Sequence, residues 1–342
     1  MRAPGDLGQL RIQKPYVIFM GDVADLASAK TGLGLRDWCR KDVVGQIRTA
    51  AGAVDLGLRE VTVDQAVQAG ARSVVIGIAP DGGSLKQSWT ATLAEAAAAG
   101  LDVVSGLHTR LEAYPLIVAA ARDARSRLVN VRHPEHGFPV GTGRKRTGRR
   151  VLTVGTDCAL GKKYTALTIT AELQARGLSA AFRATGQTGI MIAGAGVPID
   201  AMVADFIAGA AEALSPDAPA DHWDVIEGQG SLFHPSYAAV TLGLVHGSQP
   251  DAMVLCHDSR RRTIDGLPDF ALPPLAVAIR RYEEAAHLTN PAAKIVGLSL
   301  NTGGMMEEEA AAAIEIAALE TGLPVGDPIR NGGTLLADAL LA

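Results

Sequence analysis

The sequence predicts a two-domain α/β protein: a Rossmann-like domain with a parallel sheet in residues 1–140, followed by a P-loop NTPase-like α/β domain in residues 141–342. Short β-branched runs alternate with helical apolar patterns along the chain, an order typical of parallel sheets. Residues 151–165 read as strand, glycine-bounded loop and helix, which is the order of a P-loop. Between the two domains, residues 134–150 are poor in apolar residues and rich in glycine and basic residues, which is typical of a linker, so we place the boundary near Gly141.

Four strands and three helices are predicted in the N-terminal domain. The strands are 16–20, 73–78, 102–105 and 128–131, and the helices are 63–69, 93–99 and 116–124. Ligands of parallel sheets bind at the carboxyl ends of the strands, where polar residues follow. His108 stands alone beyond one such end, after a glycine. It is either an ordinary loop residue or a general base.

The P-loop candidate runs from Gly155 to Lys163. Its backbone N–H groups and the N-terminus of the following helix converge on one point, and Lys162 adds a positive charge, so an anion is favoured there. The hydroxyl residue that usually follows the lysine and binds magnesium is replaced by Lys163, so the loop should hold phosphate better than a metal–nucleotide pair. The residues predicted to bind a cofactor are Gly155, Thr156, Asp157, Cys158, Gly161, Lys162 and Lys163.

Cys158 lies inside this loop, where oriented amides and lysines would lower the pKa of a thiol. No histidine is adjacent in sequence to activate it, so the favoured interpretation is a packing role. Cys256 and His257 have no partners at a recognisable ligand spacing, and we predict no metal site.

Polar residues also follow the predicted strands of the C-terminal domain. The strand 180–184 leads into Thr185, Gln187 and Thr188, whose hydroxyl and amide groups suit a small polar ligand. The strand 223–226 delivers Glu227, which could orient water or magnesium, pair with a loop lysine, or accept a proton. Further along lie the candidate anion-binding residues Arg260, Arg262 and Arg330.

The basic residues of the linker allow two interpretations. Arg144, Lys145, Arg146, Arg149 and Arg150 come directly before the P-loop strand. The favoured interpretation is a solvated basic connector; the other is that some of them meet additional phosphates of a ligand held in the loop.

Composition limits the classes of function. The hydrophobic content of 48%, with 20% charged residues, predicts sizeable cores, and the net charge of −4 gives no general attraction to nucleic acid. No apolar run reaches the roughly 18 residues of a membrane helix, and three widely separated cysteines indicate a reducing cytoplasm. We therefore expect a cytoplasmic protein with no nucleic-acid or membrane partner, and alanine-rich helices that favour a homo-oligomer.

Several blocks carry a family resemblance. The loop GTDCALGKKYTAL, the segment IEGQGSL followed by His234 and Pro235, and the final DPIRNGG resemble a family of two-domain bacterial proteins long catalogued without a function. The resemblance extends over nearly the whole chain. It implies a D-glutamate N-acetyltransferase that uses acetyl-CoA, and the C-terminal domain is also similar to dethiobiotin synthetase, which binds ATP and magnesium.

Together, the loop and the resemblance predict acetyl transfer without a metal. Gly155 to Lys163 would hold a phosphate of coenzyme A, Glu227 or His108 would deprotonate the amine, and arginines would bind the two carboxylates of D-glutamate. The alternative is an ATP- and magnesium-dependent small-molecule kinase or ligase, and a non-catalytic metabolite sensor is a third class.

Overall fold

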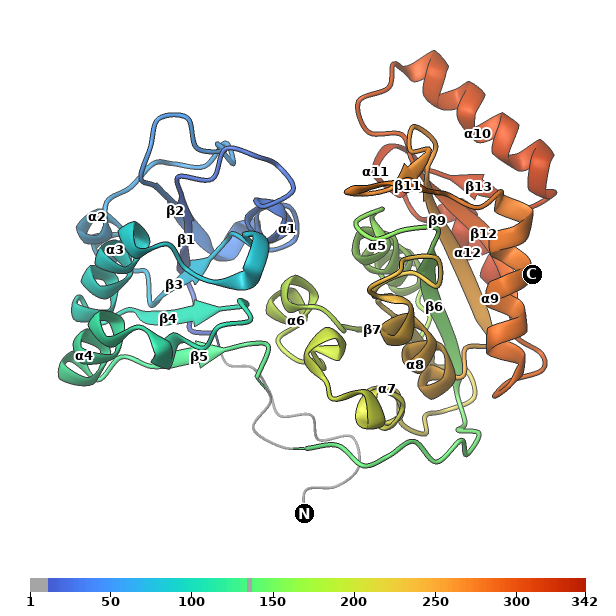
Figure 1. The fold of residues 1–342 in the computed structure, drawn as a ribbon, viewed down its shortest axis with the longest axis horizontal. Helices are drawn as coiled ribbons and strands as arrows, with labels where there is room; N and C mark the ends of the chain where they lie inside the picture. The colour runs from blue at the N-terminus through green and yellow to red at the C-terminus, as the bar shows by residue number, and fades with distance from the viewer. Residues whose placement is uncertain (1–11, 134–136) are drawn as a thin grey trace. The chain divides into compact units, whose positions relative to one another are not determined.

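A computed structural model describes residues 12–133 and 137–342, so part of the predicted linker lies outside the described residues. The chain forms two compact α/β units (Figure 1). The N-terminal unit extends to residue 136 and also includes residues 186–201; the C-terminal unit contains residues 137–185 and 202–342. The predicted fold class, a Rossmann-like parallel-sheet domain followed by a P-loop domain, is confirmed.

The N-terminal unit is built on a parallel sheet with the strand order β2-β1-β3-β4-β5. The strands are β1 (Tyr16–Gly21), β2 (Val43–Arg48), β3 (Ser73–Ile76), β4 (Asp102–Ser105) and β5 (Leu128–Asn130). The helices are α1 (Lys30–Trp38), α2 (Val63–Gln68), α3 (Gln87–Ala98) and α4 (Pro115–Ala124), with short 3-10 turns at Arg40–Asp42, Asp81–Gly83 and Leu111–Ala113. β1, β3 and β4 are buried along their whole length, as expected for strands of a parallel sheet covered on both faces.

Helix α6 (Gln187–Ala193) belongs to the N-terminal unit although it follows the first strands of the P-loop domain. Thr188 and Thr31 of α1 share a buried hydrogen bond of 3.0 Å between their hydroxyl oxygens. A Cβ atom at Gly106 would lie 1.6 Å from Gln187 Oε1, so a glycine is needed there for α6 to pack. A single boundary near Gly141 was predicted, and the inclusion of residues 186–201 in the N-terminal unit was not.

The C-terminal unit has a six-stranded parallel sheet in the order β13-β12-β9-β6-β8-β7. The strands are β6 (Arg149–Gly155), β7 (Ala180–Arg183), β8 (Trp223–Ile226), β9 (Ala252–Asp258), β12 (Lys294–Asn301) and β13 (Val325–Gly326), and a separate antiparallel hairpin consists of β10 (Thr263–Ile264) and β11 (Leu267–Ala271). The strand that leads to Glu227 lies beside the P-loop strand, because β8 pairs with β6.

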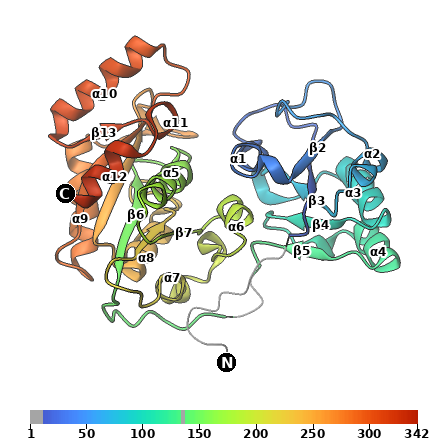
Figure 2. The ribbon, with the colours of Figure 1, turned by 180° about the vertical axis from the view of Figure 1, so that it is seen from behind.

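Helices cover both faces of this sheet. They are α5 (Lys162–Ala175), α7 (Ile207–Leu214), α8 (Ala238–Ser248), α9 (Leu275–His287), α10 (Glu307–Thr321), α11 (Pro328–Asn331) and α12 (Thr334–Leu341), with 3-10 turns at Ile199–Ala201 and Ala204–Phe206 elsewhere in the chain. α5 and α12 lie on one face and α8 and α9 on the other, as the two opposite views show (Figures 1 and 2). None of the helices in the described residues is both long and apolar enough to cross a bilayer.

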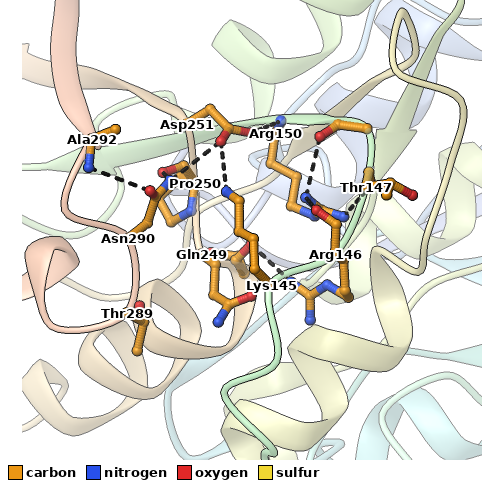
Figure 3. Close-up of polar contacts among 12 residues, drawn as sticks. Lys145, Arg146, Thr147, Arg150, Gln249, Pro250, Asp251, Thr289, Asn290 and Ala292 are labelled. Atoms are coloured by element: carbon orange, nitrogen blue, oxygen red, sulfur yellow. Dashed lines mark hydrogen bonds and ion pairs between the residues drawn. The ribbon is translucent and has the colours of Figure 1, made fainter.

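Two arginines of the basic linker are buried, so the interpretation of the linker as a solvated connector is wrong for them. Arg146 is 6% exposed and Arg150 is fully buried. Arg146 Nη2 donates to the carbonyl oxygens of Gly247 (2.8 Å) and Ser248 (2.9 Å) at the end of α8. Arg150 Nη2 donates to the carbonyl oxygen of Thr147 at 2.7 Å (Figure 3). The Arg146 guanidinium fastens the linker to the end of α8 and stabilises the negative end of that helix dipole, whereas Arg150 holds the linker at the start of β6.

Candidate active site

The loop between β6 and α5 has the geometry of an anion cradle. It begins at Gly155, the last residue of β6, and ends where α5 begins at Lys162. Gly161 adopts φ 108°, a conformation that favours glycine, and turns the chain into the helix. No side chain caps the N-terminus of α5. Because the first N–H groups of a helix have no partner inside the helix, an uncapped N-terminus favours an anion.

Lys162 points back into this loop. Its side chain is buried, and Nζ donates to the carbonyl oxygen of Asp157 at 2.8 Å. Burial lowers the pKa of Lys162, while negative charge on Cys158, Cys256 and Asp157 would act in the opposite direction. The neighbouring Lys163 places Nζ 4.9 Å from the ring centroid of Tyr164.

Asp157 fixes the shape of the loop. Its buried carboxylate accepts the N–H of Cys158 on Oδ1 at 2.6 Å, and on Oδ2 it accepts Arg261 Nη1 (2.7 Å) and the N–H of Asp265 (2.9 Å). Arg261 Nη1 also donates to the carbonyl oxygen of Cys158 at 2.8 Å. The carboxylate and Arg261 together tie the turn before the β10–β11 hairpin to the loop.

Of the three consecutive arginines, Arg261 contacts the loop, whereas the predicted carboxylate-binding residues were Arg260 and Arg262. Arg260 instead pairs with Asp258 at 3.1 Å, with 49% of its side chain exposed. Arg262 is exposed and donates to the carbonyl oxygen of Ser259 at 2.9 Å. Within residues 12–133 and 137–342, neither forms a hydrogen bond or ion pair with the loop, and both are exposed.

Tyr282 of α9 anchors the start of the loop. Its hydroxyl donates to the carbonyl oxygen of Gly155 at 2.7 Å and accepts the N–H of Leu232 at 3.2 Å. Ser231 Oγ donates to the same Gly155 oxygen at 2.9 Å. Burial raises the pKa of Tyr282 to about 12, so the hydroxyl remains a donor at neutral pH. The segment after β8 is thereby held against the P-loop.

That segment carries His234 to the vicinity of Cys158. A ring nitrogen of His234, Sγ of Cys158 and a carboxylate oxygen of Asp157 all lie within 4.8 Å of one another. His234 is 7% exposed, and its Nδ1 accepts the N–H of Ser236 at 3.1 Å. These three residue types can ligate a metal, but both oxygens of Asp157 already accept hydrogen bonds. Cys158 and His234 alone fall short of the four ligands of a structural zinc site.

A second histidine, His257 at the end of β9, supports the loop. Its Nδ1 lies 2.9 Å from Thr156 Oγ1. Burial lowers the pKa of His257, so the ring is neutral near pH 7 and can accept the threonine proton. The pair positions Thr156 at the end of β6.

Glu227 and Thr185 lie together at the ends of β8 and β7. Oε2 of the buried Glu227 accepts the N–H of Thr185 at 2.9 Å, and Thr185 Oγ1 donates to the carbonyl oxygen of Glu227 at 2.5 Å. The next residue, Gly228, has no room for a side chain: a Cβ there would lie 1.7 Å from the carbonyl oxygen of Thr153 and 3.0 Å from Lys162 Cδ. The carboxylate is therefore held rigidly beside the base of the P-loop.

In the N-terminal unit, His108 follows β4 and packs against Gly83. The pKa of His108 is lowered, first by burial and then by the charge of Arg132, so the ring is neutral near pH 7. Arg132 donates through Nε to the carbonyl oxygen of Gly106 at 2.6 Å and forms an ion pair with Asp200. Gln187, another predicted ligand residue, adjoins the same Gly106.

The hydrogen bonds of Arg330 connect α11 with the residue that follows β12. Its Nε donates to Thr302 Oγ1 at 2.8 Å, and Thr302 also bonds to Asp327, which caps α11. The guanidinium is one third exposed, so it still reaches solvent.

Several residues at the loop were not predicted as site residues, among them His234, Arg261 and Tyr282. His234 was visible only as part of a family block, and Arg261 only as the centre of a run of three arginines. Tyr282 reads as a core position of an amphipathic helix, and no local signal connects it with Gly155.

Comparisons with known proteins cover nearly the whole chain. Residues 46–134 match the family model described as the DUF1611_N Rossmann-like domain, and residues 139–337 match the DUF1611_C P-loop domain, both domains of unknown function. A D-glutamate N-acetyltransferase from Tritonibacter scottomollicae is 48% identical over 97% of this chain and 99% of its own, and one from Pseudoalteromonas sp is 43% identical over 94% and 97%. The crystal structure of a DUF1611 family protein from Anabaena variabilis superposes with a TM-score of 0.86 at 35% identity, covering 96% of this chain and 99% of that one.

Proposed function

The chain belongs to the DUF1611 family, and from that premise we propose that it is an N-acetyltransferase that transfers the acetyl group of acetyl-CoA to the amino group of D-glutamate. The observation that carries the proposal is the similarity over both domains to two relatives named for this reaction, at 48% and 43% identity. Because each relative is covered almost to its full length, no domain of theirs is missing from this chain.

The P-loop is proposed to bind acetyl-CoA rather than to cleave a nucleotide. Its converging N–H groups and Lys162 favour negative charge. Lys163 stands where a magnesium-binding hydroxyl usually stands, so the loop lacks that metal ligand. Acetyl-CoA offers two groups that suit such a loop: a phosphate, as the sequence analysis expected, and the oxyanion that forms at the thioester carbon during acyl transfer. We propose that neither requires a metal ion.

For the acceptor, we propose that arginines bind the two carboxylates of D-glutamate. Arg260 and Arg262 are accessible, and a guanidinium binds a carboxylate through two parallel hydrogen bonds. Four further residues remain candidates for binding the acceptor: Thr185, Gln187, Thr188 and Arg330. His108 and Glu227 are the candidate bases for the amine, and the lowered pKa of His108 leaves its ring able to accept a proton at neutral pH.

We further propose a cytoplasmic homo-oligomer. The large apolar side chains of Ile316 and Leu319 on α10 are 65% and 79% exposed, which is the kind of surface that pairs between subunits. Light scattering of the purified protein tests this, and a monomer at micromolar concentration would contradict it.

The test of the reaction uses purified protein, acetyl-CoA and D-glutamate in the presence of a chelator and without ATP. Free CoA thiol, detected with a disulfide dye, and N-acetylglutamate, detected by mass spectrometry, should appear together. L-Glutamate should be a poorer acceptor, because a pocket that fixes both carboxylates presents the amine of one enantiomer to the thioester. No acetylated product, together with magnesium-dependent formation of ADP on another substrate, would favour the kinase or ligase class.

A further inference from the structure

We propose that Cys158 is the acetyl-accepting nucleophile, and that the reaction passes through an S-acetyl-cysteine on the P-loop. The inference rests on the proposed function for the identity of the donor. It replaces the packing role that the sequence favoured, because the histidine that sequence adjacency did not supply comes from a segment 76 residues away.

The first support is the position of the thiol relative to His234. A ring nitrogen of His234 lies within 4.8 Å of Cys158 Sγ, close enough to tighten into a hydrogen bond when a substrate enters. His234 is more than nine-tenths buried, and its Nδ1 accepts the N–H of Ser236. Because Nδ1 acts as an acceptor, Nε2 is the ring nitrogen that can carry a proton. An N–H on Nε2 can stabilise a sulfur anion.

The second support is that the loop fixes the backbone of Cys158 on both sides. Its N–H donates to Asp157 Oδ1 at 2.6 Å, and its carbonyl oxygen accepts Arg261 Nη1 at 2.8 Å. A residue whose only task is to fill space does not need both peptide groups held by a buried ion pair. Such a clamp places Sγ at a defined point, as nucleophilic attack requires.

The third support is the electrostatic setting. Lys162 Nζ donates to the carbonyl oxygen of Asp157, the residue before Cys158, and α5, whose N-terminus has no side-chain cap, begins at Lys162 itself. Positive charge and oriented N–H groups favour the thiolate form of a cysteine. The same N–H groups can receive the oxyanion that forms when the thiolate attacks a carbonyl carbon.

The chemical steps balance without a metal or an oxidant. The Cys158 thiolate attacks the acetyl carbonyl carbon of acetyl-CoA, the C–S bond to coenzyme A breaks, and CoA leaves as a thiolate. The free amine of D-glutamate then attacks the S-acetyl-cysteine; the amide bond forms, the Cys158 thiolate departs, and the amine proton passes to a base. One thioester replaces another in the first step, so that step is nearly neutral in free energy.

This inference assigns the thioester end of acetyl-CoA to the P-loop. The pantetheine arm separates the thioester from the phosphates, so one loop cannot hold both. The phosphates would then bind to other cationic side chains, and not to residues 155–163, where a phosphate site was predicted.

The experiment is acetyl trapping on the whole protein. Protein is mixed with acetyl-CoA alone, quenched with acid, and analysed by intact mass and peptide mapping. One acetyl group should appear on the peptide that contains Cys158, and adding D-glutamate should remove it. Cys158→Ser should lose the thioester adduct, whereas Cys39→Ser, a buried cysteine of the other unit, should keep it.

Kinetics supply the second measurement. Initial rates with both substrates varied should give parallel double-reciprocal lines, the pattern of a covalent intermediate, and Cys158→Ala should lower kcat by roughly a thousandfold or more. His234→Gln should slow adduct formation and change its pH profile.

Failure of this inference can be distinguished from failure of the proposed function. If the parent protein makes N-acetyl-D-glutamate with intersecting lines and no adduct, and Cys158→Ala keeps its kcat, the nucleophile is refuted while the function stands. If the adduct forms with acetyl-CoA but D-glutamate never removes it, the acceptor is wrong and the nucleophile stands. If neither adduct nor product forms, both are refuted.

Discussion

Asp157 should be one of the most sensitive positions for the stability of the C-terminal unit. Its fully buried carboxylate accepts three hydrogen bonds, one of them from Arg261. Removing one partner of a buried ion pair costs about 3–5 kcal/mol, because the remaining charge is left without compensation. Arg261 is 22% exposed and keeps its bond to Cys158, so it can rehydrate in part. The expected cost of Asp157→Ala is therefore near the lower end, about 3 kcal/mol.

The assay is thermal and urea unfolding of the full chain. At ~2–4 °C per kcal/mol for a unit of this size, Asp157→Ala should lower the midpoint of the C-terminal transition by about 6–12 °C. The double variant Asp157→Ala/Arg261→Met should be more stable than Asp157→Ala, because no guanidinium remains that has lost its buried carboxylate partner. Asp265→Ala is the matched control: its side chain is 64% exposed and meets Arg261 only at 3.5 Å. A loss in Asp157→Ala no larger than in this control would refute the reasoning.

Three further predictions follow from the loop and its surroundings. Burial lowers the pKa of His257 below its ordinary 6.5, so as the pH falls the unfolded chain is protonated at His257 before the folded chain, and the free energy of unfolding decreases below pH 6.5. In urea unfolding at two pH values, the free energy of unfolding of His257→Gln should depend less on pH than that of the parent. The same pH dependence in both proteins would contradict this. Gly228→Ala would place a Cβ 1.7 Å from the carbonyl oxygen of Thr153 and should cost at least about 1–3 kcal/mol, whereas Gly52→Ala, which meets nothing within 4 Å, should be nearly neutral in the same melts. Lys163→Thr restores the usual P-loop hydroxyl and should strengthen magnesium–ATP binding, measured by calorimetry. Equal affinity in parent and variant would show that Lys163 does not weaken the binding of a metal–nucleotide pair.

The alternation of strands and helices could be predicted because it rests on local patterns. Strands such as β1 and β9 contain long apolar runs with buried side chains. β2 was missed because its buried run includes Gly45 and Gln46, and the Gln46 amide is satisfied by the N–H of Leu56 and the carboxylate of Asp55. Asp55 and Leu56 come after β2 in the sequence. The residues of the strand alone therefore do not show that the Gln46 amide will be satisfied and that the segment will be a buried strand.

The identity of the site residues was less predictable, because it depends on contacts between distant segments. The P-loop was recognisable from its spacing, but the choice between Arg261 and its neighbours depends on how the turn before the β10–β11 hairpin is held. The approach of His234 to Cys158 depends on Ser231 and Tyr282, which bond to Gly155 from another loop and another helix. The position of Gln187 in the N-terminal unit likewise depends on the packing of α6 at Gly106.

The most direct test of the proposed reaction is a mass-spectrometric measurement of N-acetylglutamate formed from acetyl-CoA and each enantiomer of glutamate, with chelator present and ATP absent. The proposal predicts product with D-glutamate in amounts equal to the CoA released, a much lower rate with L-glutamate, and no effect of the chelator. Absence of N-acetyl-D-glutamate from active, folded protein, or a strict requirement for ATP and magnesium, would contradict it.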